Sequence, residues 1–184
     1  MVRNRKSKAS WFRTNWVDIR FLLVFAACMG LYYVLTLTPP IRQGFFPAYL
    51  KLNASVCGTI LHLMGEDVSV QDKAIVSASG PSIQLERGCD AVEPSALFVS
   101  AVLASPVALL PRLAAAAGGV LVLGLLNLVR VVSLFLVRLH FPAAFDAVHL
   151  DVWQALFIFL AIALWALWAS RVAHRRVVQS HVST

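Results

Sequence analysis

Charged side chains are scarce in this chain. Of its 184 residues, 14% are Asp, Glu, Lys or Arg and 59% are hydrophobic, and the mean hydropathy is +0.76. This shortage of charge excludes a disordered tail and a conventional cytosolic enzyme. Cysteine is also scarce, with three residues, which excludes a disulfide scaffold. Most of the chain is therefore expected to lie in a lipid bilayer.

The basic side chains do not gather into a patch or stripe. Lys and Arg outnumber Asp and Glu by 16 to 9, and the net charge is +7, but the basic residues stand at the ends of apolar runs. This layout predicts contact of both tails with an anionic membrane surface and no nucleic-acid partner. The residues concerned are Arg3, Arg5, Lys6, Lys8, Arg13 and Arg20 before the first run, and Arg171, Arg175 and Arg176 after the last.

Four stretches carry no charge for 17 or more residues: 21–38, 94–110, 113–129 and 152–170. Each approaches the roughly 20 residues with which a helix crosses a hydrocarbon core of about 30 Å, and a helix satisfies its own backbone hydrogen bonds there. The expected fold is all-α integral membrane, a bundle of four transmembrane helices. We expect the first span to be retained, because Pro39 and Pro40 follow it in place of a signal-peptide cleavage site. The predicted spans are 21–38, 90–110, 113–137 and 150–170.

The distribution of Lys and Arg also sets the orientation of the spans. Basic tails at 1–20 and 171–184 place both termini in the cytoplasm, and a tight turn at Pro111 and Arg112 falls on the same side. Eight of the nine acidic residues then lie in or beside the outer segments. One multi-pass membrane domain is expected, with extracytoplasmic segments at 39–89 and 138–149.

The outer segment after the first span has a pattern of its own. Between 45 and 64 apolar residues recur at helical spacing, which predicts an amphipathic helix on the outer membrane face. Short β-like runs at 68–70, 74–77 and 82–86 predict a small β-hairpin or three-stranded cap. Small residues at 114–119 predict close helix packing. The helical stripe consists of Tyr49, Leu52, Val56, Ile60 and Leu63.

Cys89 lies where the second predicted span begins. A helix N-terminus lowers the pKa of a thiol and favours the nucleophilic thiolate. Asp90 and Glu93 have the spacing of a capping box, or Glu93 itself caps the helix; Glu93 either contacts a substrate or serves only as this cap. Two other interpretations stay open for Cys89, a buried filler or a disulfide with Cys57 on the oxidising outer side. Cys28, in the first span, is expected to be inert.

Arg130 and His149 are the next two unusual residues. A guanidinium within a span is costly unless it faces a cavity or a partner, so Arg130 either has such a role or extends toward the outer headgroups. Asn127, one turn earlier, is placed to hold it. His149 stands at the start of the fourth span, where it is either a proton-transfer group or a helix cap.

Counting along each helix brings these residues to one level. From the cytoplasmic border, Cys89 is 22 residues along its span, Arg130 is 18 and His149 is 22, or about 33, 27 and 33 Å at 1.5 Å per residue. Such a set suits acyl transfer: the thiolate attacks a peptide carbonyl, the guanidinium stabilises the oxyanion, and the imidazole moves the proton. Asp146 or Asp151 would orient the imidazole, and no cofactor or metal is needed.

The segments around Cys89, Arg130 and His149 resemble the exosortase/archaeosortase family of membrane-embedded cysteine transpeptidases. The family's proposed catalytic Cys, Arg and His match these three positions. The small size and the patterns Cys-x-x-Val-Glu and Asn-Leu-Val-Arg look most like the compact type-H exosortases, although Asp90 and Ala91 stand where many members have Ser-Gly or Thr-Gly. With the order of the spans, the similarity covers roughly 21–168. The matching segments are 88–93, 126–135 and 147–154.

This resemblance implies a membrane-embedded cysteine protease or transpeptidase in the inner (plasma) membrane of a bacterial cell, with its active site on the extracytoplasmic side. Its partners would be exported proteins with a C-terminal sorting signal: a short motif, which in type-H members begins Ile-Pro-Thr-Leu, then a transmembrane helix and a basic end. The enzyme would cleave the tail through a thioester and transfer the protein to an unidentified nucleophile or to water.

Two rival functions stay open. A metal-dependent intramembrane protease would use His149 with Asp146, Asp151 or Glu93, but the chain has no H-E-x-x-H or Cys-x-x-Cys motif. A non-catalytic membrane subunit of an export or polysaccharide assembly, or a small channel, would line a polar path with Arg130 and Asn127. Activity that survives loss of the thiol favours the non-catalytic class, and inhibition by chelators favours the metal.

Overall fold

The computed structural model describes residues 15–78 and 80–182, with side chains described as far as Val172. The basic side chains predicted to lie at the membrane surface before position 15, and those of Arg175 and Arg176, lie outside the described residues. Arg20 and Arg171 are within them and are exposed.

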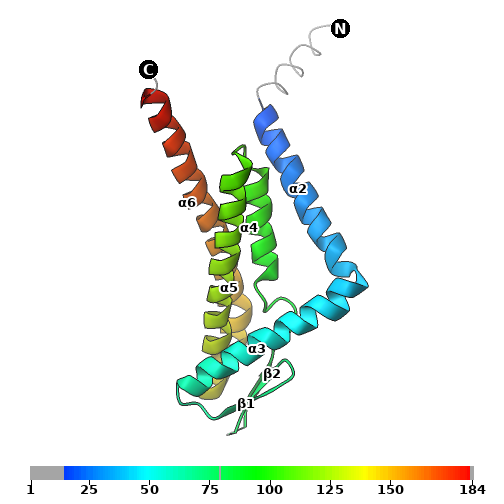
Figure 1. The fold of residues 1–184 in the computed structure, drawn as a ribbon. Helices are drawn as coiled ribbons and strands as arrows, with labels where there is room; N and C mark the ends of the chain where they lie inside the picture. Colours follow the sequence, from blue (N-terminus) through cyan, green and yellow to red (C-terminus); the bar gives the residue numbers. More distant parts are fainter. Residues whose placement is uncertain (1–14, 79, 183–184) are drawn as a thin grey trace, which may run out of the picture.

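Long helices run side by side and a further helix crosses one end of the molecule, with a small sheet beyond it (Figure 1). The start of α2 and the end of α6 lie at the opposite end from the crossing helix. The helices are α2 (Trp16–Leu37), α3 (Phe46–Leu63), α4 (Val92–Ala104), α5 (Leu109–His140) and α6 (Trp153–Val182), and the strands are β1 (Val68–Gln71), β2 (Ala74–Ser77) and β3 (Ser82–Gln84). Short helical turns join them at η1 (Pro40–Phe45), η2 (Pro142–Ala144) and η3 (Ala147–Val152).

Three of the described helices are long and apolar enough to cross a membrane, Trp16–Leu37, Leu109–His140 and Ala147–Val172. α4 is apolar but has 13 residues, which at 1.5 Å per residue give about 20 Å, short of a hydrocarbon core of about 30 Å. The protein is therefore mostly helical, with three helices of membrane-spanning length, one shorter apolar helix and a three-stranded sheet.

The helix within the second predicted span, 90–110, is shorter than that span. α4 ends at Ala104, and the chain reverses before Pro111 and not at it. Pro106 explains the early end, because the residue before a proline is driven to an extended conformation, and Ser105 has φ −66° and ψ 139°. Pro111 lies in the first turn of α5, where its missing N–H leaves no helical hydrogen bond unmade.

Two hydrophobic cores lie along α5. The outer core joins α3, the sheet and the second half of α5, and the inner core joins α4, the first half of α5 and α6. Arg130 stands on α5 where the two cores meet. The outer core includes Leu50, Ala54, Cys57, Leu61, Ile75, Leu85, Val131, Val132 and Phe135. The inner core includes Ala91, Phe98, Val102, Leu123, Phe157 and Ala161.

The helix predicted at 45–64 is present as α3, and a second set of residues, distinct from the predicted apolar stripe, forms the side of α3 that faces the protein. The buried positions include Leu50, Cys57 and Leu61, whereas Leu52 and Leu63 of the stripe are 60% and 80% exposed. Two sides of α3 are thus apolar. One packs into the outer core, and the other leaves exposed apolar side chains of the kind that bind a membrane interface.

The predicted β cap is a three-stranded antiparallel sheet in the order β1-β2-β3. Its first turn contains Asp72 at φ 56°, a left-handed conformation that Asp tolerates better than most residues. Ile75 on the central strand is fully buried in the outer core. We call α3 and the sheet together the cap.

Gly119 marks a close approach of α4 and α5. A Cβ atom at this position would overlap the ring of Phe98 on α4, which is itself buried, whereas a Cβ at neighbouring Gly118 would meet no atom within 4 Å. The close packing predicted from the small residues at 114–119 is confirmed at Gly119.

Gly119→Ala should lower the free energy of unfolding by about 1–3 kcal/mol, because overpacking forces the Phe98 ring out of place. Gly118→Ala is the matched control and should leave stability unchanged or raise it by about 0.5–1 kcal/mol, since alanine is the better helix former. Thermal unfolding of each variant in detergent measures the difference. Equal melting temperatures would contradict the close contact.

Candidate active site

The segment 85–91, here called the site loop, carries Cys89 from the cap to α4. Its first residue, Leu85, is buried in the outer core and its last, Ala91, in the inner core. A turn is closed by the backbone N–H of Cys89, which donates to the carbonyl of Glu86 at 3.0 Å. Gly88 has φ 95°, a conformation that costs glycine little. The loop is thus fixed at both ends and bent tightly beside Cys89.

The start of α4 differs from both predicted caps. Ala91 precedes the helix in a left-handed conformation, φ 54°, which is unfavourable for a residue with a Cβ and typical of functional sites. Asp90 is 3% exposed, and its Oδ1 accepts a hydrogen bond from the Val92 N–H at 3.2 Å. Tyr49 of α3 donates its hydroxyl to the Asp90 carbonyl at 3.2 Å. Asp90 thus satisfies the first N–H of α4 without Glu93, and it also connects this end of α4 to α3.

Cys89 and His149 are in direct contact. The Cys89 Sγ lies 2.9 Å from the His149 Nε2, although 60 residues separate them. His149 lies on η3, a turn of π-helix that leads into α6, and π-turns are frequent at functional sites. The ring of Phe145 packs beside the imidazole, with ring centroids 5.4 Å apart. The structure therefore joins a thiol and an imidazole within hydrogen-bonding distance.

Arg130 completes the group from α5. Its side chain is 4% exposed, and its Nη1 donates to the Gly88 carbonyl at 3.3 Å. The guanidinium carbon lies 5.4 Å from the centre of the Phe157 ring, a cation–π contact that offsets part of the cost of burial. Its buried Nε has no hydrogen-bond partner in the described part of the chain. The Arg130 guanidinium, which has unused N–H donors, is thus bonded to the residue that precedes Cys89.

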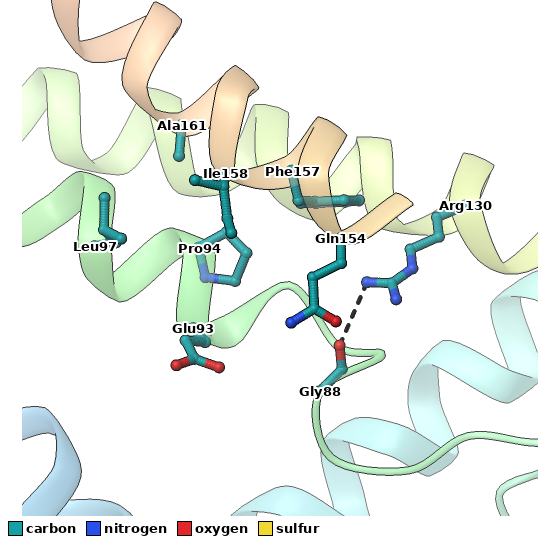
Figure 2. A pocket seen from close by; sticks show the side chains of 9 residues that line it. All are labelled: Gly88, Glu93, Pro94, Leu97, Arg130, Gln154, Phe157, Ile158 and Ala161. Atoms are coloured by element: carbon teal, nitrogen blue, oxygen red, sulfur yellow. Dashed lines mark hydrogen bonds between the residues drawn. The ribbon is translucent and has the colours of Figure 1, made fainter. Parts of the chain in front are cut away.

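A cavity of about 130 Å³ opens beside this group, between α4 and α6 (Figure 2). Gly88 and Arg130 form one end of it, and Gln154 projects from α6 toward the same end. Cys89 and His149 do not line the cavity; they adjoin it through Gly88 and Arg130. The lining residues are Gly88, Glu93, Pro94, Leu97, Arg130, Gln154, Phe157, Ile158 and Ala161.

The thiol of Cys89 does not have the lowered pKa expected from a helix N-terminus. Burial raises its pKa above the ordinary value, the charge of Arg130 opposes this rise, and the charge of Asp90 adds to it. Cys89 also lies three residues before α4 begins, outside the first turn where the helix dipole acts. Burial therefore favours the neutral thiol over the thiolate, and His149 is in place to accept its proton.

The structure assigns other neighbours to several predicted site residues. Asn127 is buried and donates to the Asn53 Oδ1 of α3 at 3.4 Å, so it does not hold Arg130. Asp146 and Asp151 are exposed, and within the described residues neither has a hydrogen bond to His149. Glu93 lines the cavity, and its Oε1 accepts the hydroxyl of Tyr33 on α2 at 2.7 Å.

The alternative disulfide between Cys57 and Cys89 is absent, and Cys28, Cys57 and Cys89 are all free. Cys57 is fully buried in the outer core, with its Sγ 3.9 Å from the Leu128 carbonyl. Burial raises the pKa of Cys57 to about 12. This thiol is a packing residue and not a nucleophile.

Two residues of the site were not singled out from the sequence, Gln154 and Phe157. Gln154 is the single amide in the apolar run 152–170, and a polar side chain in such a run is a signal that could have found it. Phe157 carries no such signal, because one aromatic residue among many becomes a cation–π partner only through the fold.

The described residues contain no group of three or more His, Cys, Asp or Glu side chains placed to hold a metal ion. No protein-family model, curated protein or solved structure matches the chain.

The pH dependence of Cys89 alkylation tests the electrostatics of the site. Arg130→Gln removes a charge that lowers the pKa of Cys89, so the midpoint of the alkylation rate should move to higher pH. Asp90→Asn removes a charge that raises this pKa and should move the midpoint to lower pH. Peptide-resolved mass spectrometry after iodoacetamide treatment measures both. Shifts in the same direction would contradict the arrangement.

Proposed function

We propose that this chain is a membrane-embedded cysteine transpeptidase or peptidase of the exosortase type. The observation that carries the proposal is the 2.9 Å contact between the Cys89 Sγ and the His149 Nε2, with the buried Arg130 guanidinium bonded to the carbonyl of the preceding Gly88. Nucleophile, base and cation come from the site loop, η3 and α5, three separate parts of the chain.

The reaction begins with proton transfer from the Cys89 thiol to the His149 Nε2 as the sulfur attacks a peptide carbonyl of the substrate. A carbon–sulfur bond forms, and the negative charge moves to the carbonyl oxygen. His149 then gives its proton to the departing nitrogen, the carbon–nitrogen bond breaks, and a thioester remains on Cys89. An amine, hydroxyl or water attacks the thioester carbon and passes its proton to His149. The carbon–sulfur bond then breaks, the protein is released on the new nucleophile, and His149 returns the proton to the Cys89 sulfur.

Arg130 has the properties that the oxyanion requires. A guanidinium stays protonated at all physiological pH values, and this one is buried, where its charge acts through a low dielectric. Its bond to Gly88 uses Nη1, and Nη2 has no acceptor among the described residues, which leaves a donor for a substrate oxygen. Donors fixed before the reaction stabilise a developing charge without reorganisation.

The membrane would enclose the bundle as far as the level of Arg130, with the cap on the extracytoplasmic side of the inner membrane of a bacterial cell. Arg130 lies 18 positions after Arg112 on α5, with no charged residue between them; this rise of about 27 Å is close to one hydrocarbon thickness. The start of α2 and the end of α6, with Arg20 and Arg171, lie at the opposite end (Figure 1), which favours cytoplasmic termini.

α4 would act as the fourth crossing together with the site loop. The helix covers the inner part of the membrane, and the loop continues outward to the cap. Irregular backbone at membrane depth is tolerated only where protein covers it. The buried Asp90 and Ala91 and the Gly88 carbonyl bonded to Arg130 meet this requirement.

The substrates proposed are exported proteins with a C-terminal sorting tail that ends in a transmembrane helix and basic residues. α2 and α6 expose large apolar side chains, among them Leu22, Leu31 and Phe159, which a substrate helix can contact within the bilayer. Such packing would bring the junction between the exported domain and its membrane helix to the level of Cys89.

Coexpression with a tailed substrate tests the proposal. Cys89→Ser and His149→Ala should each reduce tail removal to background, whereas Cys28→Ser, on α2 away from the site, should cleave normally. Arg130→Ala should lower the rate of tail removal by about 100- to 1,000-fold, which is the typical effect of removing an oxyanion donor. Immunoblotting follows the tail, and hydroxylamine sensitivity identifies a thioester adduct. Normal cleavage by Cys89→Ser would reject the mechanism.

A further inference from the structure

The cavity beside Arg130 has two chemically different ends. At the end next to the site loop lie Arg130, with its unpartnered Nε, and Gln154, an exposed amide with no hydrogen bond to another described residue. The Glu93 carboxylate is turned toward α2, where it accepts the Tyr33 hydroxyl. The other end is apolar and is formed by Pro94, Leu97, Phe157, Ile158 and Ala161.

The cavity runs from the site away from the cap. Along α4 it passes from Glu93 to Leu97, and along α6 from Gln154 to Ala161, so its apolar end is one to two helical turns further from the outer side (Figure 2). Its volume of about 130 Å³ is near that of an engineered cavity of about 150 Å³ that binds benzene. It therefore has room for one aliphatic or aromatic side chain.

We propose that this cavity is the subsite for the substrate residue immediately after the scissile bond, and that it selects an apolar side chain there. The inference rests on the proposed function. The polypeptide on the acyl side of the bond leads to the exported domain outside the membrane, whereas the leaving side leads into the bilayer. Because the cavity extends from the reacting atoms in that second direction, it receives the leaving side.

Each end of the cavity has a part in this selection. Arg130 is shared with the reaction centre, where it holds the carbonyl oxygen of the scissile bond, and Gln154 accepts the N–H of the leaving segment. Ala161 and Leu97 form the apolar end and limit its depth. A charged side chain placed there would lose its hydration and find no partner among the apolar residues.

The test uses full-length protein and a tailed substrate whose cleavage site has been located by mass spectrometry. The residue after the scissile bond is changed to Leu, Gly, Trp or Asp. Wild type should cleave the Leu substrate at least about tenfold faster than the Asp substrate. Ala161→Leu, which fills the apolar end, should lose about tenfold or more on the Leu substrate and much less on the Gly substrate.

Three controls separate the outcomes. Ala117→Leu makes the same change at an exposed position of α5, away from the surfaces of α2 and α6 proposed to contact the substrate helix, and should cleave normally. Alkylation of Cys89 should proceed equally in all variants. If Ala161→Leu does not fold, Leu97→Ala provides the test of the subsite. This substitution enlarges the apolar end of the cavity and should improve cleavage of the Trp substrate relative to the Leu substrate.

The inference alone would be overturned if the wild type cleaved the Leu, Gly, Trp and Asp substrates at equal rates. It would also be overturned if the cleavage rate depended on the residue before the scissile bond and not on the residue after it. Absence of any cleavage dependent on Cys89 would overturn the proposed function and the inference with it.

Discussion

The arrangement of the site depends on one buried cation. Arg130 stands where the outer and inner cores meet, and a guanidinium that is 4% exposed needs partners near its level. It finds the Gly88 carbonyl and the Phe157 ring. To present that carbonyl, the site loop adopts left-handed conformations at Gly88 and Ala91. The position of Cys89 between them is therefore tied to the burial of Arg130.

The contact between Cys89 and His149 requires both cores. Leu85 fixes one end of the site loop in the outer core, and Ala91 fixes the other in the inner core. His149 arrives from a different direction, on the π-turn that begins the last helix. Neither the cap nor the helices alone would hold the sulfur 2.9 Å from the imidazole. A disturbance of either core is therefore transmitted to the reacting pair through the loop.

Helical rise explains why much of this site could be predicted from the sequence. A rise of about 1.5 Å per residue accounts for the level of Arg130 on α5, whereas Cys89 reaches that level through the site loop as well as α4, which has 13 residues. Turn residues located the three strands. Pro106 indicates that α4 ends early, but the predicted span was extended to Leu110 because the uncharged stretch continues that far. Two features could not be predicted from local patterns. One is the contact of Asn127 with Asn53, which lies 74 residues away. The other is the burial of Cys89, which raises its pKa where a lowered pKa was expected.

The raised pKa of Cys89 suits the proposed reaction better than a lowered one would. A resting thiolate beside Arg130 would form an ion pair with the guanidinium and occupy the charge that the oxyanion needs. A protonated thiol leaves Arg130 free until a substrate carbonyl enters, and His149 then takes the proton as the carbon–sulfur bond forms. The charge created in the site appears on the substrate oxygen, opposite the cation that the fold has buried there.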